Sequence, residues 1–143
     1  MAESLRVVLD TNVWISGIFF GRGVPAQLLS GWRDGQFVVL MTSATLEELE
    51  RILRRKTEQF GASPDLAVGW LNYVIAYATI VDVETSVEGV SRDSKDDIML
   101  EAAVNGTADY LVTGDRDLLV LKNFMGAWVV TPREFLDLLR AGG

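Results

Sequence analysis

The feature that most constrains the fold is a set of short, uninterrupted apolar runs separated by longer stretches with helical periodicity. The runs do not alternate polar and apolar residues, which is typical of strands buried on both faces of a parallel sheet. They span Leu5–Leu9, Phe37–Met41, Tyr110–Val112 and Trp128–Val130, with a fifth candidate at Thr79–Val83. Strands that alternate with helices predict an α/β fold with a central parallel sheet.

Helix signals fill the intervening segments. The expected helices cover residues 24–34, 43 to about 56, 64 to about 78, 96–104 and a last segment from 132. Ser43 and Ser63 are expected as N-caps, and Gly106 as a stop signal. Residues 131–134, with the sequence TPRE, form the pattern of a capping box. Because no repeat or linker interrupts the chain, we expect one domain over residues 1–143.

The composition excludes the catalytic and metal sites that need His or Cys. The chain contains no His and no Cys, so it has neither a Ser-His-Asp or Cys-His nucleophile system nor a His/Cys zinc site. Carboxylates, hydroxyls, Lys, Arg or a hard metal ion bound by oxygen remain. The net charge of −7 argues against a broadly basic nucleic-acid surface, although a bound divalent cation would reverse the charge locally.

The sequence contains no membrane or export signal that we can identify. No apolar stretch approaches the roughly 20 residues that cross a membrane. Residues 1–5 lack both the basic and the long apolar region of a signal peptide. We therefore expect no membrane contact and a cytoplasmic location.

Two acids follow directly on predicted strands. Asp10 comes after residues 7–9, and Asp115 follows the strand at 110–112, with Asp117 two residues further on. Because the carboxyl ends of parallel strands meet at one edge, we expect Asp10 and Asp115 to face one crevice. Carboxylates that share a crevice repel each other unless a cation lies among them, and Mg²⁺ or Mn²⁺ suits an all-oxygen site.

Acids on the predicted helices extend this group. Glu47 points away from the apolar face of its helix, whereas Glu48 and Glu50 lie at the two edges and either could reach over the sheet. Asp96 and Asp97 fall in the first turn of a later helix. Each acid also has an ordinary interpretation as a cap, a turn residue, a partner of the helix dipole or a solvated charge. The convergence of several acids on one crevice favours a site.

Four blocks of the sequence, taken together and in order, resemble the PIN-domain family, and in particular its VapC-like group of bacterial toxins. The blocks read VVLDTNVWISGI, TSATLEELERIL, DSKDDIMLEAAVNGTADYLVTGDRDLLVL and VVTPREFLDLL. The resemblance covers nearly the whole chain and is weakest across about residues 56–92. It implies a three-layer α/β/α fold around a parallel sheet and the activity of a metal-dependent ribonuclease.

The family's acidic set, carried onto this sequence, falls on Asp10, Glu48, Asp97 and Asp115, with Asp117 beside it. The resemblance thus selects the first of the two edge glutamates. Many toxins of this type carry Asn where Asp115 stands here, followed by an Asp that matches Asp117. The role of fourth acid is therefore divided between these two residues.

The resemblance also bears on the neighbours of these acids. Among Asp93, Asp96 and Asp97 we favour Asp97, because it directly precedes an apolar run at 98–100. Asn12 and Thr113 fall where the family places supporting polar groups.

The predicted activity is hydrolysis of RNA phosphodiesters, with one or two Mg²⁺ or Mn²⁺ ions held by Asp10, Asp97 and Asp115. Without His, a water activated by such an ion is the nucleophile that the composition leaves. Glu48 would orient or deprotonate this water or bind a second ion, and Asp117 would adjust the ligands.

Basic and aromatic residues point to contacts with partners. The RILRRK segment at 51–56 is either a solvated helix end or an RNA contact. Arg116 is expected first as a salt-bridge partner and second as a contact to the scissile phosphate. Trp14, Phe19 and Phe20 fit a core, although the resemblance permits a homodimer face or a groove for a cognate antitoxin there.

Two other functions stay open at this point. A non-catalytic α/β domain that binds a partner or a phosphate ligand also carries acids at strand ends. Such receiver-type modules usually have a Lys at a later strand end, where this chain has Thr131 and Pro132. A PIN nuclease could instead process RNA or cleave DNA flaps, and the short chain, with little room for a DNA-binding arch, favours RNA.

Overall fold

A six-stranded sheet with the strand order β3-β2-β1-β4-β6-β5 forms the centre of the computed structural model, which describes residues 4–142. The segment inspected for a signal peptide includes residues 1–3, which lie outside this described part. Every neighbouring pair of strands is parallel except β5 and β6. The strands are β1 (Leu5–Leu9), β2 (Phe37–Met41), β3 (Thr79–Ile80), β4 (Tyr110–Val112), β5 (Asn123–Phe124) and β6 (Ala127–Val130).

The predicted strands are confirmed, with two differences at the sheet edges. β3 ends at Ile80, because the chain turns into solvent at the exposed Asp82 and Val83. β5 was not predicted, and it forms a hairpin with β6 through a two-residue turn at Met125 and Gly126. Both turn residues have positive φ, 49° and 99°, as tight hairpins require.

The helices are α1 (Thr11–Phe19), α2 (Val24–Arg33), α3 (Ser43–Gln59), α4 (Pro64–Tyr77), α5 (Ser94–Asn105), α6 (Arg116–Leu119) and α7 (Pro132–Gly142). The N-cap of α3 is Thr42 rather than the expected Ser43, since Thr42 exchanges capping bonds with Thr45. The capping box that opens α7 is present as predicted. Helices α1 and α6 were not predicted as elements, and both begin immediately after a strand-end acid.

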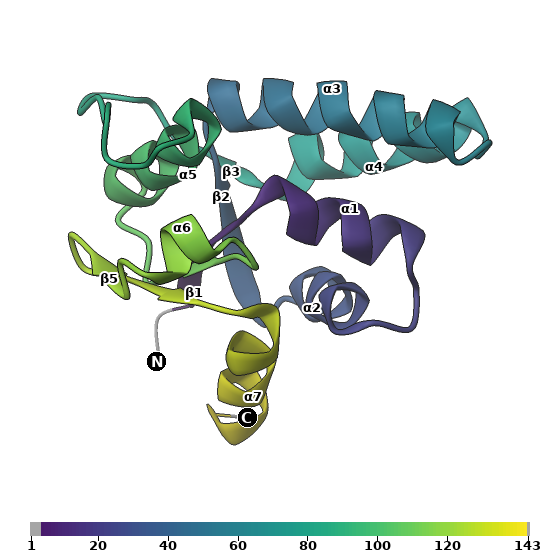
Figure 1. The fold of residues 1–143 in the computed structure, drawn as a ribbon. Helices are drawn as coiled ribbons and strands as arrows, with labels where there is room; N and C mark the ends of the chain where they lie inside the picture. Colours follow the sequence, from purple (N-terminus) through teal and green to yellow (C-terminus); the bar gives the residue numbers. More distant parts are fainter. Residues whose placement is uncertain (1–3, 143) are drawn as a thin grey trace.

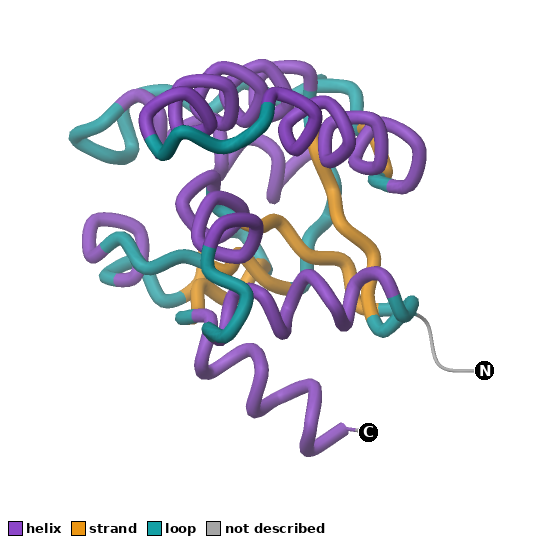
Figure 2. Tube along the Cα trace, turned by 90° about the vertical axis from the view of Figure 1, so that its right-hand side faces the viewer, coloured by secondary structure: helices purple, strands orange, loops and turns teal. Residues whose placement is uncertain are grey.

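Two apolar cores lie on opposite faces of the sheet. Successive residues of β1 alternate between them: Val7 and Leu9 pack with α1, α2, α3, α4 and α7, whereas Val8 packs with α5 and α6. Figure 1 shows α1 and α2 on one side of the sheet and α5 and α6 on the other. The view turned by 90° shows the strands between helices (Figure 2). The expected three-layer α/β/α arrangement is therefore confirmed.

Backbone hydrogen bonds hold the carboxyl ends of neighbouring strands together. The Asp10 amide donates to the Val112 carbonyl (2.9 Å), and the Thr113 amide donates to the Val130 carbonyl (2.9 Å). These bonds extend the parallel ladders one step beyond β1 and β4 and fix the two strand ends side by side. In the described part of the chain, no helix is long and apolar enough to cross a membrane.

Candidate metal centre

Two strand-end acids are joined by one buried threonine. The Thr113 hydroxyl, fully buried, donates to Asp10 Oδ2 (2.7 Å) and accepts from the Asp115 amide (3.0 Å). Asp10 stands at the N-cap position of α1 but makes no side-chain cap bond, so its carboxylate turns to Thr113 instead. Asp115 caps α6 by accepting from the Asp117 amide (2.9 Å). The sequence thus placed Asp10, Thr113 and Asp115 at one edge, as the structure does.

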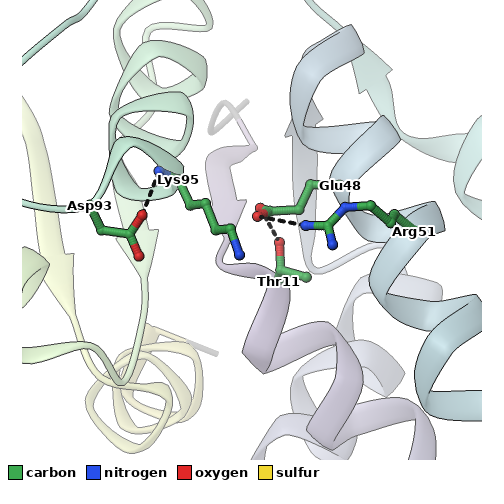
Figure 3. A network of polar contacts seen from close by, with 5 residues as sticks. All are labelled: Thr11, Glu48, Arg51, Asp93 and Lys95. Atoms are coloured by element: carbon green, nitrogen blue, oxygen red, sulfur yellow. Dashed lines mark hydrogen bonds and ion pairs between the residues drawn. The ribbon is translucent and has the colours of Figure 1, made fainter.

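Helix α3 supplies the glutamate. Glu48 Oε2 accepts from the Thr11 hydroxyl (2.9 Å), and Oε1 lies 4.0 Å from Arg51 Nη2, as Figure 3 shows. The Glu48 side chain is 10% exposed, whereas Glu50 is half exposed and pairs with Arg54 along the helix surface. Of the two glutamates that the helical periodicity left open, Glu48 is therefore the one directed to the crevice.

Helix α5 presents Asp96, not Asp97, to the same crevice. Asp96 is 6% exposed, and its carboxylate accepts from the Ser91 hydroxyl (2.9 Å). The two oxygens of Asp97 accept the Gly89 amide (2.9 Å) and the Ser91 amide (3.0 Å). Asp97 therefore fastens the loop that precedes α5.

The expectation that Asp97 lies among the crevice acids is corrected to Asp96. Neighbouring residues on a helix point about 100° apart, so only one of the pair can face the sheet edge. The apolar run after Asp97 does not decide between them. The direction of each carboxylate is decided by how α5 packs on the sheet and by the loop over residues 89–91.

The acids line one pocket of about 270 Å³ at the carboxyl edge of the sheet. Its wall contains residues from α1, α3, α5 and the ends of β1 and β4: Asp10, Thr11, Asn12, Glu48, Ile52, Arg55, Lys56, Asp93, Lys95, Asp96 and Asp115. Asn12 thus lines the pocket, near the acids as expected. Thr113 does not line it, but its buried hydroxyl donates to Asp10, which does. Arg116 does not line the pocket, and the salt bridge expected for it is missing from residues 4–142.

Burial and mutual repulsion make the ionised acids costly. Burial raises the pKa of Asp10, and the charges of Asp115 and Glu48 raise it further, while the bond from Thr113 opposes this shift. Burial also raises the pKa of Asp96, to about 6, with smaller contributions from Asp115, Asp10 and Asp93. Groups that repel one another in this way are stabilised by a cation placed between them.

The donor set fits a hard divalent ion. Asp96, Asp115 and Asp117 each offer a carboxylate oxygen, and these oxygens all lie within 4.8 Å of one another. Mg²⁺ and Mn²⁺ prefer oxygen ligands of this kind. Asp117 is exposed and stands at the rim, whereas Asp115 lines the pocket itself. Both candidates for the fourth acid therefore lie near the same point.

Three pocket residues carry positive charge, and sequence reasoning missed one of them. Lys95, on α5, extends toward Thr11 and Glu48 on the opposite side (Figure 3). Its position next to Asp96 was a weak signal, because a Lys in the first turn of a helix is usually solvated. Arg55 and Lys56 belong to the RILRRK segment, and only these two of its four cations line the pocket.

Residues 6–117 match the family model described as PIN domain. The chain belongs to the PIN domain family. PIN domains are generally metal-dependent nucleases, which agrees with an acid-lined pocket in this member. The chain is 26% identical over 142 residues to the uncharacterized protein MJ1680 of Methanocaldococcus jannaschii, with 93% of this chain and 90% of that protein covered.

Two solved structures share the PIN fold of this chain. The crystal structure of PAE2754 from Pyrobaculum aerophilum matches with a TM-score of 0.63 at 17% identity, over 96% of this chain and 90% of that one. The crystal structure of VapBC2 from Rickettsia felis, bound to a DNA fragment from their promoter, matches with a TM-score of 0.59 at 17% identity. That match covers 89% of this chain and 98% of the other.

Proposed function

We propose that this PIN domain is a metal-dependent endoribonuclease of the toxin type, which hydrolyses RNA phosphodiester bonds in the cytoplasm. One observation carries the proposal. Asp10, Glu48, Asp96 and Asp115 come from four different elements and line one pocket, although burial and repulsion penalise the charges of Asp10 and Asp96. Such an arrangement is costly in a merely structural protein, and it is useful where a divalent cation and a phosphate must meet.

The residues that would hold the ion are Asp10, Asp96 and Asp115, with Asp117 at the rim. When bound, Mg²⁺ or Mn²⁺ supplies a polarised water and offsets the negative charge that develops on the phosphate. Thr113 fixes the orientation of Asp10 through its 2.7 Å bond and thereby keeps the ligand geometry constant.

In this proposal Glu48 would orient the attacking water, take a proton from it, or bind a second ion. Its Oε2 accepts from the Thr11 hydroxyl, its Oε1 lies 4.0 Å from Arg51 Nη2, and the residue lines the pocket. Asn12 would contribute a neutral hydrogen bond to water or phosphate at the same wall. The proposal thus assigns the ion to acids at two strand ends and on α5, and the handling of the attacking water to the glutamate on α3.

A cognate antitoxin and a homodimer belong to this proposal. The likeness to the VapBC2 chain from Rickettsia felis supports a partner of antitoxin type. The homodimer is supported by family resemblance.

Cleavage of a labelled single-stranded RNA by the purified chain tests the proposal. Mg²⁺ or Mn²⁺ should permit cleavage and EDTA should stop it. Asp10→Asn should lower the rate by about 100-fold or more, because a ligand is lost while the shape of the side chain is kept. Asp137→Asn, which changes an exposed acid on α7, is the matched control and should cleave normally. Full activity of Asp10→Asn, or cleavage in EDTA, would instead favour the non-catalytic binding domain.

A further inference from the structure

We infer that the substrate lies along α3 as a single strand, from the acid pocket to an aromatic shelf made of Phe19, Phe20 and Phe60, where one of its bases stacks. The inference rests on the proposed function and specifies its substrate as unpaired RNA. It joins two features that the active site alone does not explain: a row of cations on the pocket wall and a group of exposed aromatic rings beyond it.

The cations provide a path for the phosphate backbone out of the pocket. Arg55 and Lys56 on α3 and Lys95 on α5 all line the pocket that the acids line. None of them forms an ion pair with a carboxylate in residues 4–142, so their charges are available to a ligand. A chain with a net charge of −7 would hold a polyanion through local positive charge of this kind.

A row of side chains on α3 leads from the pocket to the shelf. Glu48, Ile52, Lys56 and Phe60 follow one another at intervals of four residues, and residues at this spacing are neighbours on a helix surface. The row turns by about 40° at each step, so Phe60 lies about one turn beyond Lys56, which still lines the pocket. Phe60 directly follows the last residue of α3. At 1.5 Å per residue, the twelve positions from Glu48 place Phe60 about 18 Å along the helix. A strand that leaves the acids and follows this row past Lys56 therefore reaches the shelf after a few nucleotides.

The shelf is aromatic and open to solvent. The Phe60 ring lies 5.1 Å from that of Phe19 and 6.2 Å from that of Phe20, both in edge-to-face contact. Phe60 is 47% exposed and Phe20 is 59% exposed. Trp14, which the sequence grouped with them, is instead buried in the core. In an edge-to-face contact the edge of one ring meets the face of the other, and the exposed parts of Phe20 and Phe60 leave aromatic surface on which a base stacks.

Lys56 connects the pocket to the shelf. Its ammonium lies 5.8 Å from the centre of the Phe60 ring, and the same residue lines the pocket. A cation beside an open ring suits a nucleotide, because it meets a phosphate and a base at once. A docked amphipathic helix would instead require an apolar groove, and here the rings adjoin positive charge. In a duplex the bases are already stacked inside, so the shelf selects unpaired strands.

Fluorescence anisotropy with the Asp10→Asn protein tests the shelf without cleavage of the probe. The probes are a labelled 12-nucleotide uridine RNA, an abasic strand of the same length and a duplex RNA. Phe60→Leu keeps an apolar side chain and removes the ring, whereas Phe60→Trp keeps a ring. Trp128→Leu changes an exposed aromatic residue on β6, outside the pocket, and is the matched control.

We expect Phe60→Leu to weaken binding of the uridine RNA about tenfold, as the loss of one base stack does. Phe60→Trp and Trp128→Leu, each made in the Asp10→Asn protein, should bind as tightly as the Asp10→Asn protein itself does. The abasic strand should bind the Asp10→Asn protein more weakly than the uridine RNA does, and Phe60→Leu should not change its binding. Three results overturn the shelf: Phe60→Leu binds the uridine RNA as tightly as the Asp10→Asn protein does, Phe60→Leu weakens binding of the abasic strand as much as binding of the uridine RNA, or the protein prefers the duplex. A Phe60→Leu variant that binds normally but changes the oligomeric state also overturns it, in favour of a second copy.

Failure of the proposed function has a different signature. In that case the natural protein cleaves no RNA with Mg²⁺ or Mn²⁺, and the Asp10→Asn protein binds none of the probes. Cleavage by the natural protein together with unchanged binding by Phe60→Leu removes the shelf alone.

Discussion

Neighbouring acids on α5 should respond in opposite ways to the same substitution. Asp96→Asn should stabilise the metal-free protein at pH 7.5, whereas Asp97→Asn should destabilise it. The two side chains differ by one position in the sequence, but Asp96 lies among other carboxylates and Asp97 accepts two backbone amides. The pair therefore tests which of them faces the pocket.

The magnitude for Asp96 follows from the pKa of its carboxyl. Burial, with the charges of Asp115 and Asp10, raises this pKa from 3.8 to about 6. The unfolded chain therefore loses this proton at lower pH than the folded protein does. Between the two values the folded state binds more protons, so the free energy of unfolding falls as the pH rises from about 4 to 6. At 1.36 kcal/mol per pH unit, the penalty at pH 7.5 is up to about 3 kcal/mol.

Asparagine removes this penalty and keeps much of the local bonding. Its amide oxygen can still accept the Ser91 hydroxyl that now donates to Asp96. We expect Asp96→Asn to raise the free energy of unfolding by about 1–3 kcal/mol at pH 7.5 and by little at pH 4. Asp97→Asn places an NH₂ group against a backbone amide and should cost about 1–3 kcal/mol at pH 7.5.

Urea unfolding in EDTA, followed by circular dichroism at pH 4 and pH 7.5, measures both changes. Comparison with the natural protein at each pH separates Asp96 from the other acids that titrate in this range. The reasoning is refuted if Asp96→Asn is no more stable than the natural protein at pH 7.5, or if its gain is equally large at pH 4. A stabilising Asp97→Asn would restore Asp97 to the pocket.

Two further outcomes are expected. Thr113→Val, at a fully buried position, should lower the free energy of unfolding by about 1–3 kcal/mol and reduce cleavage, because Asp10 and the Asp115 amide lose their shared partner. Urea unfolding measures the first change and the RNA assay the second. Unchanged values would show that the two hydrogen bonds of the Thr113 hydroxyl are dispensable. Mn²⁺ at about 100 times its dissociation constant at pH 7.5 should raise the free energy of unfolding of the natural protein by about 2.7 kcal/mol at that pH. The same Mn²⁺ concentration should stabilise the protein less at pH 5, because Asp96 is then mostly protonated. Equal shifts of the melting temperature at the two pH values would contradict Asp96 as a ligand.

The strand-end part of the site could be predicted because it depends on topology alone. Parallel strands end at one edge of their sheet, so Asp10 and Asp115 had to lie near each other once β1 and β4 were neighbours. The apolar runs identified these strands, since strands buried on both faces carry continuous apolar sequence. The hairpin strand β5 was missed, because it has only two residues and depends on the left-handed turn at Met125 and Gly126.

The helical part of the site depended on rotation about a helix axis, which sequence periodicity fixes only coarsely. On α3 the periodicity narrowed the choice to Glu48 and Glu50, and the bond from Thr11 decided it. On α5 the sequence offered adjacent acids and no rule that separates them. The Gly89 and Ser91 amides bond both oxygens of Asp97, whereas the Ser91 hydroxyl bonds Asp96, which lines the pocket.

The sequence by itself determined the α/β class, the order of most elements and which side chains are left for chemistry, because apolar periodicity and the absence of His and Cys are properties of the sequence alone. Only the tertiary structure decided which carboxylates share a pocket and which cations and rings adjoin it. Side-chain direction follows from the packing of whole helices on the sheet and from loops that close over their ends, and both arise from contacts between residues far apart in the chain.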